Sequence, residues 1–188
     1  MKNPYATTYC GKDIDLMKPD YIGLSLDTIA THLAKLPRYS GANDGWYSVA
    51  RHSLIGAKAF HRRGAVERAK QFMLHDAHEA IIGEITTPVA NALGKRRVAI
   101  LKLAHDEAVE KRWNVDLRFN VKPIKEMDAE LLYREWGRLM PGDPSKHGIE
   151  MPDTTRIPED LQMMIHGRGT WQNDFIAYIN FANFLGLT

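Results

Sequence analysis

Apolar side chains recur at helical spacing along almost the whole chain. Ser25 and Ser48 precede two of these stretches as typical N-caps, and Pro88 and Pro123 stand near the first turns of two others. The pattern predicts helices at about residues 25–36, 48–63, 65–82, 87–94, 95–113, 123–140 and 171–185. A short hairpin is expected before Tyr21, and an irregular surface connection from about 140 to 158. We therefore expect an all-α fold, a compact helical bundle.

The closing stretch carries no charge after Asp174. Its apolar stripe predicts a helix that either seals the core or contacts another subunit. The aromatic residues of this stretch are Phe175, Tyr178, Phe181 and Phe184. They cover more than one helical face, which is too wide for a single core contact. We expect a homo-oligomer.

Composition limits the function classes. The 188 residues favour a single domain over 1–188, and neither an apolar leader nor a run of about 18 apolar residues is present, so a cytoplasmic protein without a membrane partner is expected. The lone Cys10 excludes a disulfide framework. The 25 Lys and Arg nearly balance the 23 Asp and Glu, which favours a small anionic ligand over nucleic acid.

Three predicted helices place ionisable side chains on faces that should be buried. These are His52, the adjacent pair His75 and Asp76, and Asp128. Taken singly, a core histidine usually bonds to a carbonyl, and an inward aspartate usually caps or bridges. Together, two imidazoles and two carboxylates form a donor set that suits a divalent metal: Mn, Fe, Co, Zn or Mg.

Two sequence blocks carry a family resemblance. Residues 46–53 read Trp-Tyr-Ser-Val-Ala-Arg-His-Ser, and residues 74–85 read Leu-His-Asp-Ala-His-Glu-Ala-Ile-Ile-Gly-Glu-Ile. They resemble the Tyr-Ser-Val-Ala-Glu-His-Ser and Leu-His-Asp-Ala-x-Glu-Ala-Tyr-x-Gly-Asp-Ile blocks of small phage and bacterial HD-domain phosphohydrolases related to 5′-deoxynucleotidases. With the later Asp128 they reproduce the order His, His-Asp, Asp of that family, and the resemblance covers roughly residues 9–140. It implies an HD-domain helical bundle.

The resemblance also implies residue roles. His52, His75, Asp76 and Asp128 would hold the metal, and Glu79 would be the catalytic carboxylate, because it lies one helical turn after His75. Glu84, where the family has Asp, would be a further active-site acid. The residues expected to meet phosphate or base are Arg38, Tyr39, Trp46 and His78. The Lys of the family's Pro-Leu-Lys is replaced here by Ala90. Two explanations of Lys95, Arg96 and Arg97 stay open: they supply the missing charge, or they form an exposed helix start.

The expected activity is hydrolysis of a deoxynucleotide. Phage relatives of this type cleave dATP to deoxynucleoside and tripolyphosphate, and we expect this reaction, in the host cytoplasm if the chain is phage-encoded. A 5′-deoxynucleotidase that acts on monophosphates and a non-catalytic HD ligand-binding module are the alternatives. A phosphodiesterase for cyclic nucleotides would need further histidine ligands. His61, His78 and His105 are better explained as exposed helix positions than as such ligands, although His78, one turn from His75, is also an expected substrate contact.

Overall fold

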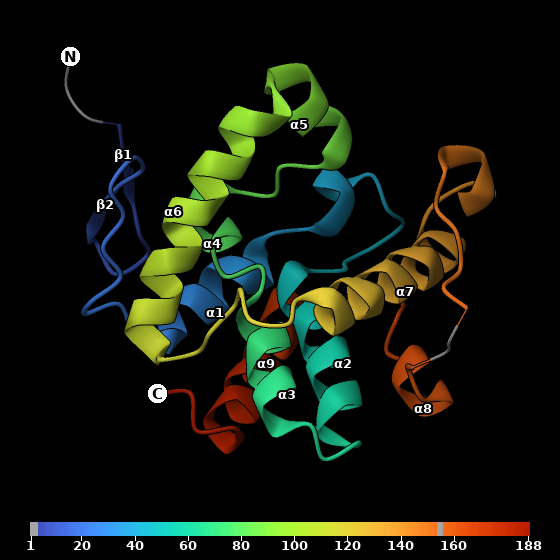
Figure 1. Cartoon of the computed structure of the whole chain (residues 1–188). Helices are drawn as coiled ribbons and strands as arrows, with labels where there is room; N and C mark the ends of the chain where they lie inside the picture. The colour runs from blue at the N-terminus through green and yellow to red at the C-terminus, as the bar shows by residue number, and fades with distance from the viewer. Residues whose placement is uncertain (1–3, 154–155) are drawn as a thin grey trace.

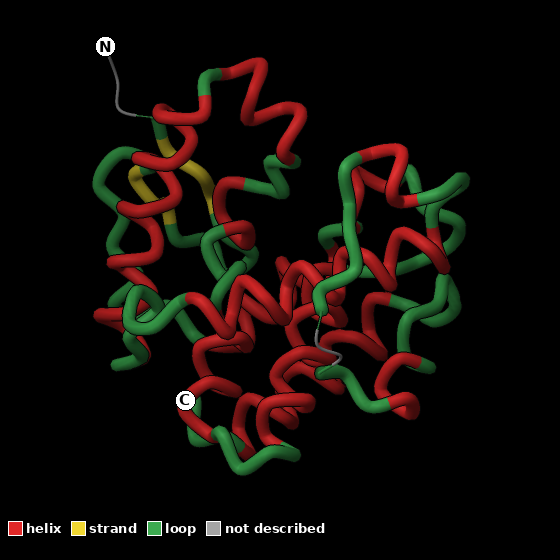
Figure 2. The backbone as a smooth tube through the Cα atoms, turned by 45° about the vertical axis from the view of Figure 1, so that its right-hand side comes forward, coloured by secondary structure: helices red, strands yellow, loops and turns green. Residues whose placement is uncertain are grey.

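The computed structural model describes residues 4–153 and 156–188. Residues 1–3, at the start of the expected hairpin segment, and 154–155, in the expected connection, lie outside the described residues. In chain order the elements are β1 (Tyr5–Thr7), β2 (Asp13–Asp15), α1 (Leu26–Lys35), η1 (Arg38–Gly41), α2 (Val49–His61), α3 (Val66–Leu74), α4 (Glu79–Ile82), α5 (Thr87–Leu93), α6 (Lys95–Trp113), α7 (Lys122–Leu139), η2 (Pro144–His147), α8 (Glu159–Gln162) and α9 (Trp171–Phe184). Helices dominate both backbone views (Figures 1 and 2), so the predicted all-α class is confirmed.

Helix α2 lies at the centre of the core. It packs against α3 and α9 and also contacts α1, α7 and α8. Eleven of its thirteen residues are buried, so the helix is enclosed well beyond the predicted inward stripe. Gly56 allows α3 to approach closely, because a Cβ there would lie 2.2 Å from the ring of Phe72. The residues that α2 presents to its neighbours are therefore fixed by tight packing.

Most predicted helices are confirmed to within two residues at each end. The side chain of Ser25 accepts a hydrogen bond from the Thr28 amide, and that of Ser48 accepts one from the Arg51 amide, as N-caps should. The expected hairpin is also present, with β1 and β2 antiparallel and Ala6 opposite Ile14. The connection after α7 is irregular and mostly exposed where it is described, apart from the single turn η2.

The continuous helix expected over 65–82 is wrong. The chain leaves the α-helix after Leu74 and resumes it at Glu79. Between them the amide of Ala77 bonds to Leu74 O at 2.9 Å and that of Glu79 to Asp76 O at 2.9 Å, which are i to i−3 bonds. In such tight turns residues three apart lie over one another, so Glu79 is aligned with Asp76 and not with His75.

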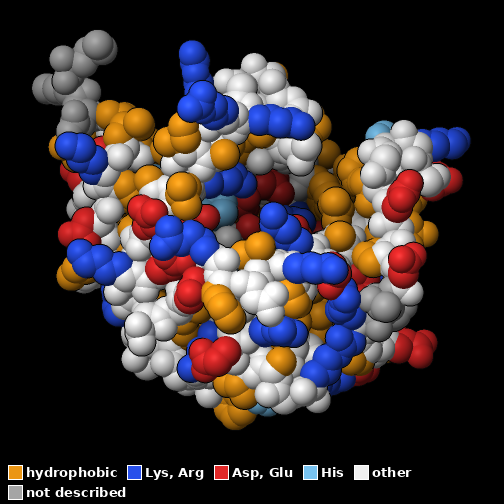
Figure 3. Space-filling model, in the orientation of Figure 1, with side chains coloured by type: hydrophobic (Ala, Val, Ile, Leu, Met, Phe, Trp, Pro, Cys, Tyr) orange, Lys and Arg blue, Asp and Glu red, His pale blue; other side chains and the backbone are white. Residues whose placement is uncertain are grey.

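The hairpin of α5 and α6 and the helix α7 border the same face of the molecule (Figure 1). Figure 3, in the same orientation, shows a hollow between them, with acidic and histidine side chains at its floor and lysine and arginine side chains around it. None of the residues of α5 is buried. No helix in the described part of the chain is both long and apolar enough to cross a membrane.

Helix α9 is joined to α2 by a buried ion pair. The Arg51 Nε donates to Asp174 Oδ1 at 2.7 Å, and the Ser48 hydroxyl donates to Asp174 Oδ2 at 2.6 Å. Tyr178 of α9 is fully buried and donates to Met73 O. Phe184, in contrast, is 66% exposed and packs beside His61. The helix therefore does seal the core, and its outer aromatic residues stay on the surface.

Candidate metal centre

Side chains from three parts of the chain converge beside α2. His52 Nε2 lies 3.2 Å from Asp128 Oδ1 of α7 and 3.9 Å from Asp76 Oδ2. His75 Nε2 lies 3.1 Å from the same Asp76 oxygen. Ligand atoms of His52, His75 and Asp76 all lie within 4.8 Å of one another, and Asp128 adjoins this group through His52. These four residues, which were expected to hold the metal, are called here the first cluster.

The donor atoms of the first cluster fit a divalent ion. Ligands that lie about 2.0–2.2 Å from a metal are separated from one another by roughly 3–3.5 Å, which is the spacing of the two shortest pairs. His52 Nε2 and His75 Nε2 are buried and make no hydrogen bond among the described residues. Because buried ring nitrogens are rarely left without a partner, the arrangement is what an ion between them would require.

The other nitrogen of each ring is held by the protein. His75 Nδ1 donates to Phe72 O at 2.7 Å, and His52 Nδ1 donates to Glu135 Oε1 at 2.6 Å. Each bond leaves Nε2 as the atom that faces the cluster. Carbonyl and carboxylate partners of this kind are the usual supports of metal-binding histidines.

Glu135 of α7 is a site residue to which the sequence patterns assigned no role. It is fully buried and accepts hydrogen bonds from Tyr47, Tyr39, Arg38 and His52. Burial opposes its ionised form, but the charges of His52 and Arg38 lower the pKa of Glu135 to about 2. The sequence feature that could have identified Glu135 is a glutamate on an apolar helical face, seven residues after Asp128.

The same group sets the charge of His52. Burial and the Arg38 guanidinium oppose a charged imidazole, yet Glu135 and Asp128 outweigh them and raise the pKa of His52 to about 9. An ion that binds at Nε2 must therefore displace a proton. Burial likewise opposes ionisation of Asp76, but His75 holds the pKa of that carboxyl well below its usual range.

Glu79 borders the first cluster and contacts a cation from α6. Its Oε1 lies 3.6 Å from Lys102 Nζ, whereas its Oε2 is buried without a hydrogen-bond partner. Burial, and then the Asp76 carboxylate, raise the pKa of Glu79 to about 8. Such a group can hold or release a proton near neutral pH. Lys102 was missed because nothing local in the sequence of α6 distinguishes it from other helix-surface lysines.

Arg38 and Glu84 belong to one loop assembly. The Arg38 Nη1 lies 3.8 Å from Asp76 Oδ2 and 3.9 Å from Glu84 Oε1. The Glu84 carboxylate accepts the backbone amides of Tyr39 at 3.1 Å and Ser40 at 2.8 Å, two residues with left-handed backbone conformations. These bonds offset a conformation that non-glycine residues rarely adopt. Glu84 therefore holds the loop that aims Arg38 at the first cluster.

Two histidines dismissed as exposed helix positions are buried, so that explanation is wrong. His105 donates from Nε2 to Leu16 O at 3.1 Å and accepts the Tyr21 hydroxyl at Nδ1, which makes it a structural core residue. His78 is only 4% exposed, and its Nδ1 bonds to Asp106 Oδ1 at 2.8 Å. His61 is the partly exposed one, packed against Phe181 and Phe184.

The remaining expected substrate contacts lie in different surroundings. Lys95 and Arg96 are exposed at the start of α6. The Tyr39 hydroxyl bonds to Glu135, and its ring meets Trp136 edge-on at 5.8 Å. The Trp46 amide donates to Gly167 O at 2.8 Å. Of the expected contacts, Arg38 and His78 thus lie beside Asp76, and Lys102 beside Glu79 is added to them.

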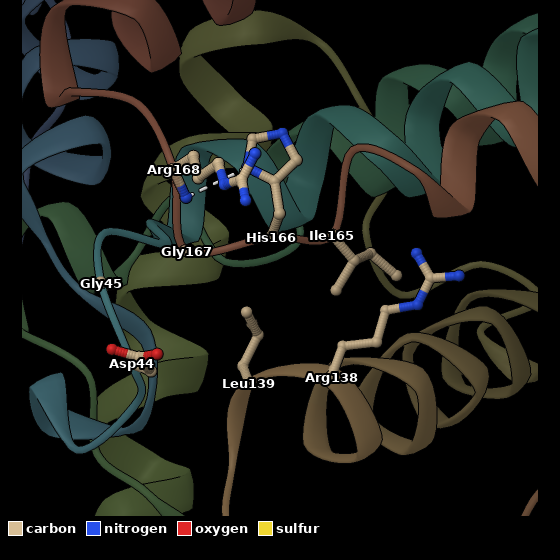
Figure 4. Close-up of a pocket in the computed structure, with 8 residues that line it drawn as sticks. All are labelled: Asp44, Gly45, Arg138, Leu139, Ile165, His166, Gly167 and Arg168. Atoms are coloured by element: carbon tan, nitrogen blue, oxygen red, sulfur yellow. Dashed lines mark hydrogen bonds between the residues drawn. The ribbon is translucent and has the colours of Figure 1, made fainter.

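A separate cavity of about 390 Å³ lies between the end of α7 and two loop segments (Figure 4). Arg138 and Leu139 of α7 line one side, and Ile165–Arg168 and Asp44–Gly45 line the others. Gly45 and Gly167 are in such close contact that a Cβ on Gly45 would lie 2.0 Å from Gly167 O. None of the residues of the first cluster lines this cavity.

Comparison with known proteins gives little guidance on activity. No protein-family model matches the chain. An uncharacterised protein of Rhodobacter capsulatus is 36% identical over 105 residues, which cover 53% of this chain and 54% of that protein. The chain therefore spans about half the length of the curated relative it matches, and the name of that relative states no activity.

Proposed function

We propose that the chain is a divalent-metal-dependent phosphohydrolase of the HD type, acting on deoxynucleotides. The observation that carries this proposal is the grouping of ligand atoms of His52, His75 and Asp76 within 4.8 Å, with Asp128 3.2 Å from His52 and two buried ring nitrogens left without hydrogen bonds. The two sequence blocks that resemble HD phosphohydrolases supply His52, His75 and Asp76, and Asp128 follows them in the order of that family. A purely structural cluster would be expected to pair those nitrogens internally.

The surrounding side chains have the chemistry that phosphoester hydrolysis needs. A divalent ion, when bound, polarises a phosphoryl group and lowers the pKa of its water. Arg38, which lies near Asp76 and Glu84, and Lys102, which lies near Glu79, neutralise phosphate oxygens. Glu79, whose raised pKa lies near neutrality, accepts the proton of the attacking water or gives one to the leaving group.

The substrate that we propose is a deoxynucleoside triphosphate, dATP by resemblance, cleaved to deoxynucleoside and tripolyphosphate. One observation favours a second candidate, a 5′-deoxynucleotidase. In the part of the chain that the structure describes, the Lys and Arg side chains that reach the carboxylates of the site are Arg38 and Lys102. Two cations match a monophosphate more readily than a triphosphate.

Product analysis with the purified full-length chain tests the proposal. Deoxynucleoside mono- and triphosphates are each incubated with Mn²⁺, Co²⁺, Mg²⁺ or Zn²⁺, with His75→Ala as the inactive control. Tripolyphosphate released together with deoxynucleoside supports the triphosphohydrolase. Orthophosphate from dAMP alone supports the 5′-deoxynucleotidase. If no deoxynucleotide is cleaved with any metal, the proposed enzyme is wrong, and the non-catalytic module is favoured.

A further inference from the structure

A second group of donor atoms adjoins the first cluster. Ligand atoms of Asp76, His78 and Glu79 all lie within 4.8 Å of one another. The tight turn between α3 and α4 produces this grouping, because it aligns Glu79 with Asp76. The three residues are called here the second cluster, and Asp76 is common to both.

His78 is held as a ligand, although the first cluster does not use it. Its Nδ1 lies 2.8 Å from a carboxylate oxygen of Asp106, which is acceptor-only, so Nδ1 carries the proton and donates it. The other ring nitrogen, Nε2, is buried without a hydrogen-bond partner. If His78 only joined this turn to α6, its bond to Asp106 would explain the position of Nδ1. It would not explain why Nε2 is buried without a partner. The carboxylate–histidine pair is the usual support of a metal ligand.

The carboxylates of the second cluster are only partly matched by cationic side chains. Lys102 lies near Glu79 Oε1, but Oε2 of the same side chain is buried without a partner. Asp76 is shared with His75 and His52 of the first cluster. Two carboxyl groups and one imidazole nitrogen form an oxygen-rich donor set, which suits Mn²⁺ or Mg²⁺.

We propose that Asp76, His78 and Glu79 bind a second divalent cation beside the first. Asp76 would contribute one side chain to both ions, and Glu79 would bind as a carboxylate through Oε2, while its Oε1 faces Lys102 and can accept the proton of the attacking water. The use of this ion rests on the proposed function: it supplies the charge that a polyphosphate needs and that Arg38 and Lys102 alone do not supply. The substrate class is then a nucleoside polyphosphate.

Manganese binding to the metal-free full-length chain tests this proposal without an activity assay. Equilibrium dialysis should give two Mn²⁺ per wild-type chain and one per chain for His78→Ala. Glu79→Gln, which keeps the shape of the side chain, should also leave one. Asp106→Asn should weaken the second site by about 10- to 100-fold. His61→Ala, which removes a histidine that packs on surface aromatic rings, should keep two.

The outcomes separate the second site from the proposed function. One Mn²⁺ per wild-type chain at saturation, or two in both His78→Ala and Glu79→Gln, would overturn the second site. If His78→Ala does not fold by circular dichroism, the Glu79→Gln result decides. If the chain binds two Mn²⁺ but hydrolyses no deoxynucleotide, the second site stands and the proposed function fails. If the chain binds one Mn²⁺ and hydrolyses deoxynucleotides, the proposed function stands and the second site fails.

Discussion

His52 and Glu135 are joined by a 2.6 Å hydrogen bond between side chains that have no exposed surface. The bond fixes which imidazole nitrogen faces the first cluster, and the same carboxylate holds Tyr39, Tyr47 and Arg38. One glutamate thus connects a proposed ligand with the loop that carries the proposed phosphate-binding arginine. Its removal should therefore affect metal binding and stability together.

Glu135→Gln keeps the shape of the side chain but loses its charge and one acceptor. We expect metal affinity at the first cluster to fall by about 10- to 100-fold, as for other partners of ligating histidines. The free energy of unfolding should fall by about 3–5 kcal/mol, because buried cationic partners lose their counter-charge. Metal titration and urea unfolding measure both effects. Glu107→Gln, in an exposed pair with Arg118, should change stability by less than about 1 kcal/mol; equal effects of the two substitutions would contradict the role given to Glu135.

Metal affinity at the first cluster should rise with pH. The pKa of His52 is raised to about 9 in the metal-free protein, so at pH 7 an entering ion must displace a proton. Affinity should increase by about tenfold per pH unit up to pH 9 and level off above it. Isothermal titration in buffers of different ionisation enthalpy also counts the released protons. An affinity that is constant between pH 7 and 9 would show that His52 is not a ligand.

The pKa of Glu79 predicts a pH-dependent stability of the metal-free protein. Burial, followed by Asp76, raises it to about 8, above the ordinary value of 4.5. Since the folded state holds the Glu79 proton more tightly than the unfolded state, the proton contributes to the free energy of unfolding. This contribution is fully present below about pH 4.5 and is lost as pH rises through 8. Glu79→Gln cannot ionise, so its melting temperature relative to wild type should increase from pH 5 to pH 8 and then stay constant. Asp160→Asn, at an exposed pair with Arg62, should show no such trend over this range.

The parts of the site that local patterns predicted are those within one helix or turn. The cap at Ser48 follows from its residue type at the start of an apolar stretch, and the place of His52 on the inner face of α2 follows from helical period. Lys102 and Asp106 could not be assigned in this way, because they lie on α6 and meet Glu79 and His78 only through tertiary packing. Apolar period also could not reveal the break after Leu74, where backbone bonds shorten to i−3 while the residues remain compatible with a helix.

Arg51 should be essential for stability and not for the metal. It stands where the resembled block has Glu, and its guanidinium bonds to Asp174 at 2.7 Å and to the carbonyls of His166 and Arg168. Arg51→Met leaves the buried Asp174 charge without its cation, which should cost about 3–5 kcal/mol. The double variant Arg51→Met/Asp174→Asn should recover part of that loss. Urea unfolding measures both, and a loss of metal content in the folded variants would contradict this separation.

The contact between Gly56 and Phe72 should link core packing to the first cluster. A Cβ at position 56 would lie 2.2–2.6 Å from three atoms of the Phe72 ring, so the ring must move. That ring packs on His75 with centroids 4.2 Å apart and on His52 at 5.7 Å. Gly56→Ala should therefore lower the free energy of unfolding by about 1–3 kcal/mol, as overpacking does, and weaken metal binding several-fold.

Gly137→Ala is the matched control for this prediction. Gly137 lies on the exposed side of α7, and a Cβ there meets no atom within 4 Å. Alanine in a helix interior is favoured over glycine by about 0.5–1 kcal/mol, so this variant should be slightly more stable than wild type, with unchanged metal affinity. Urea unfolding and manganese titration of both variants provide the comparison. If Gly56→Ala unfolds at the wild-type midpoint and binds manganese equally well, Phe72 does not position the ligating histidines.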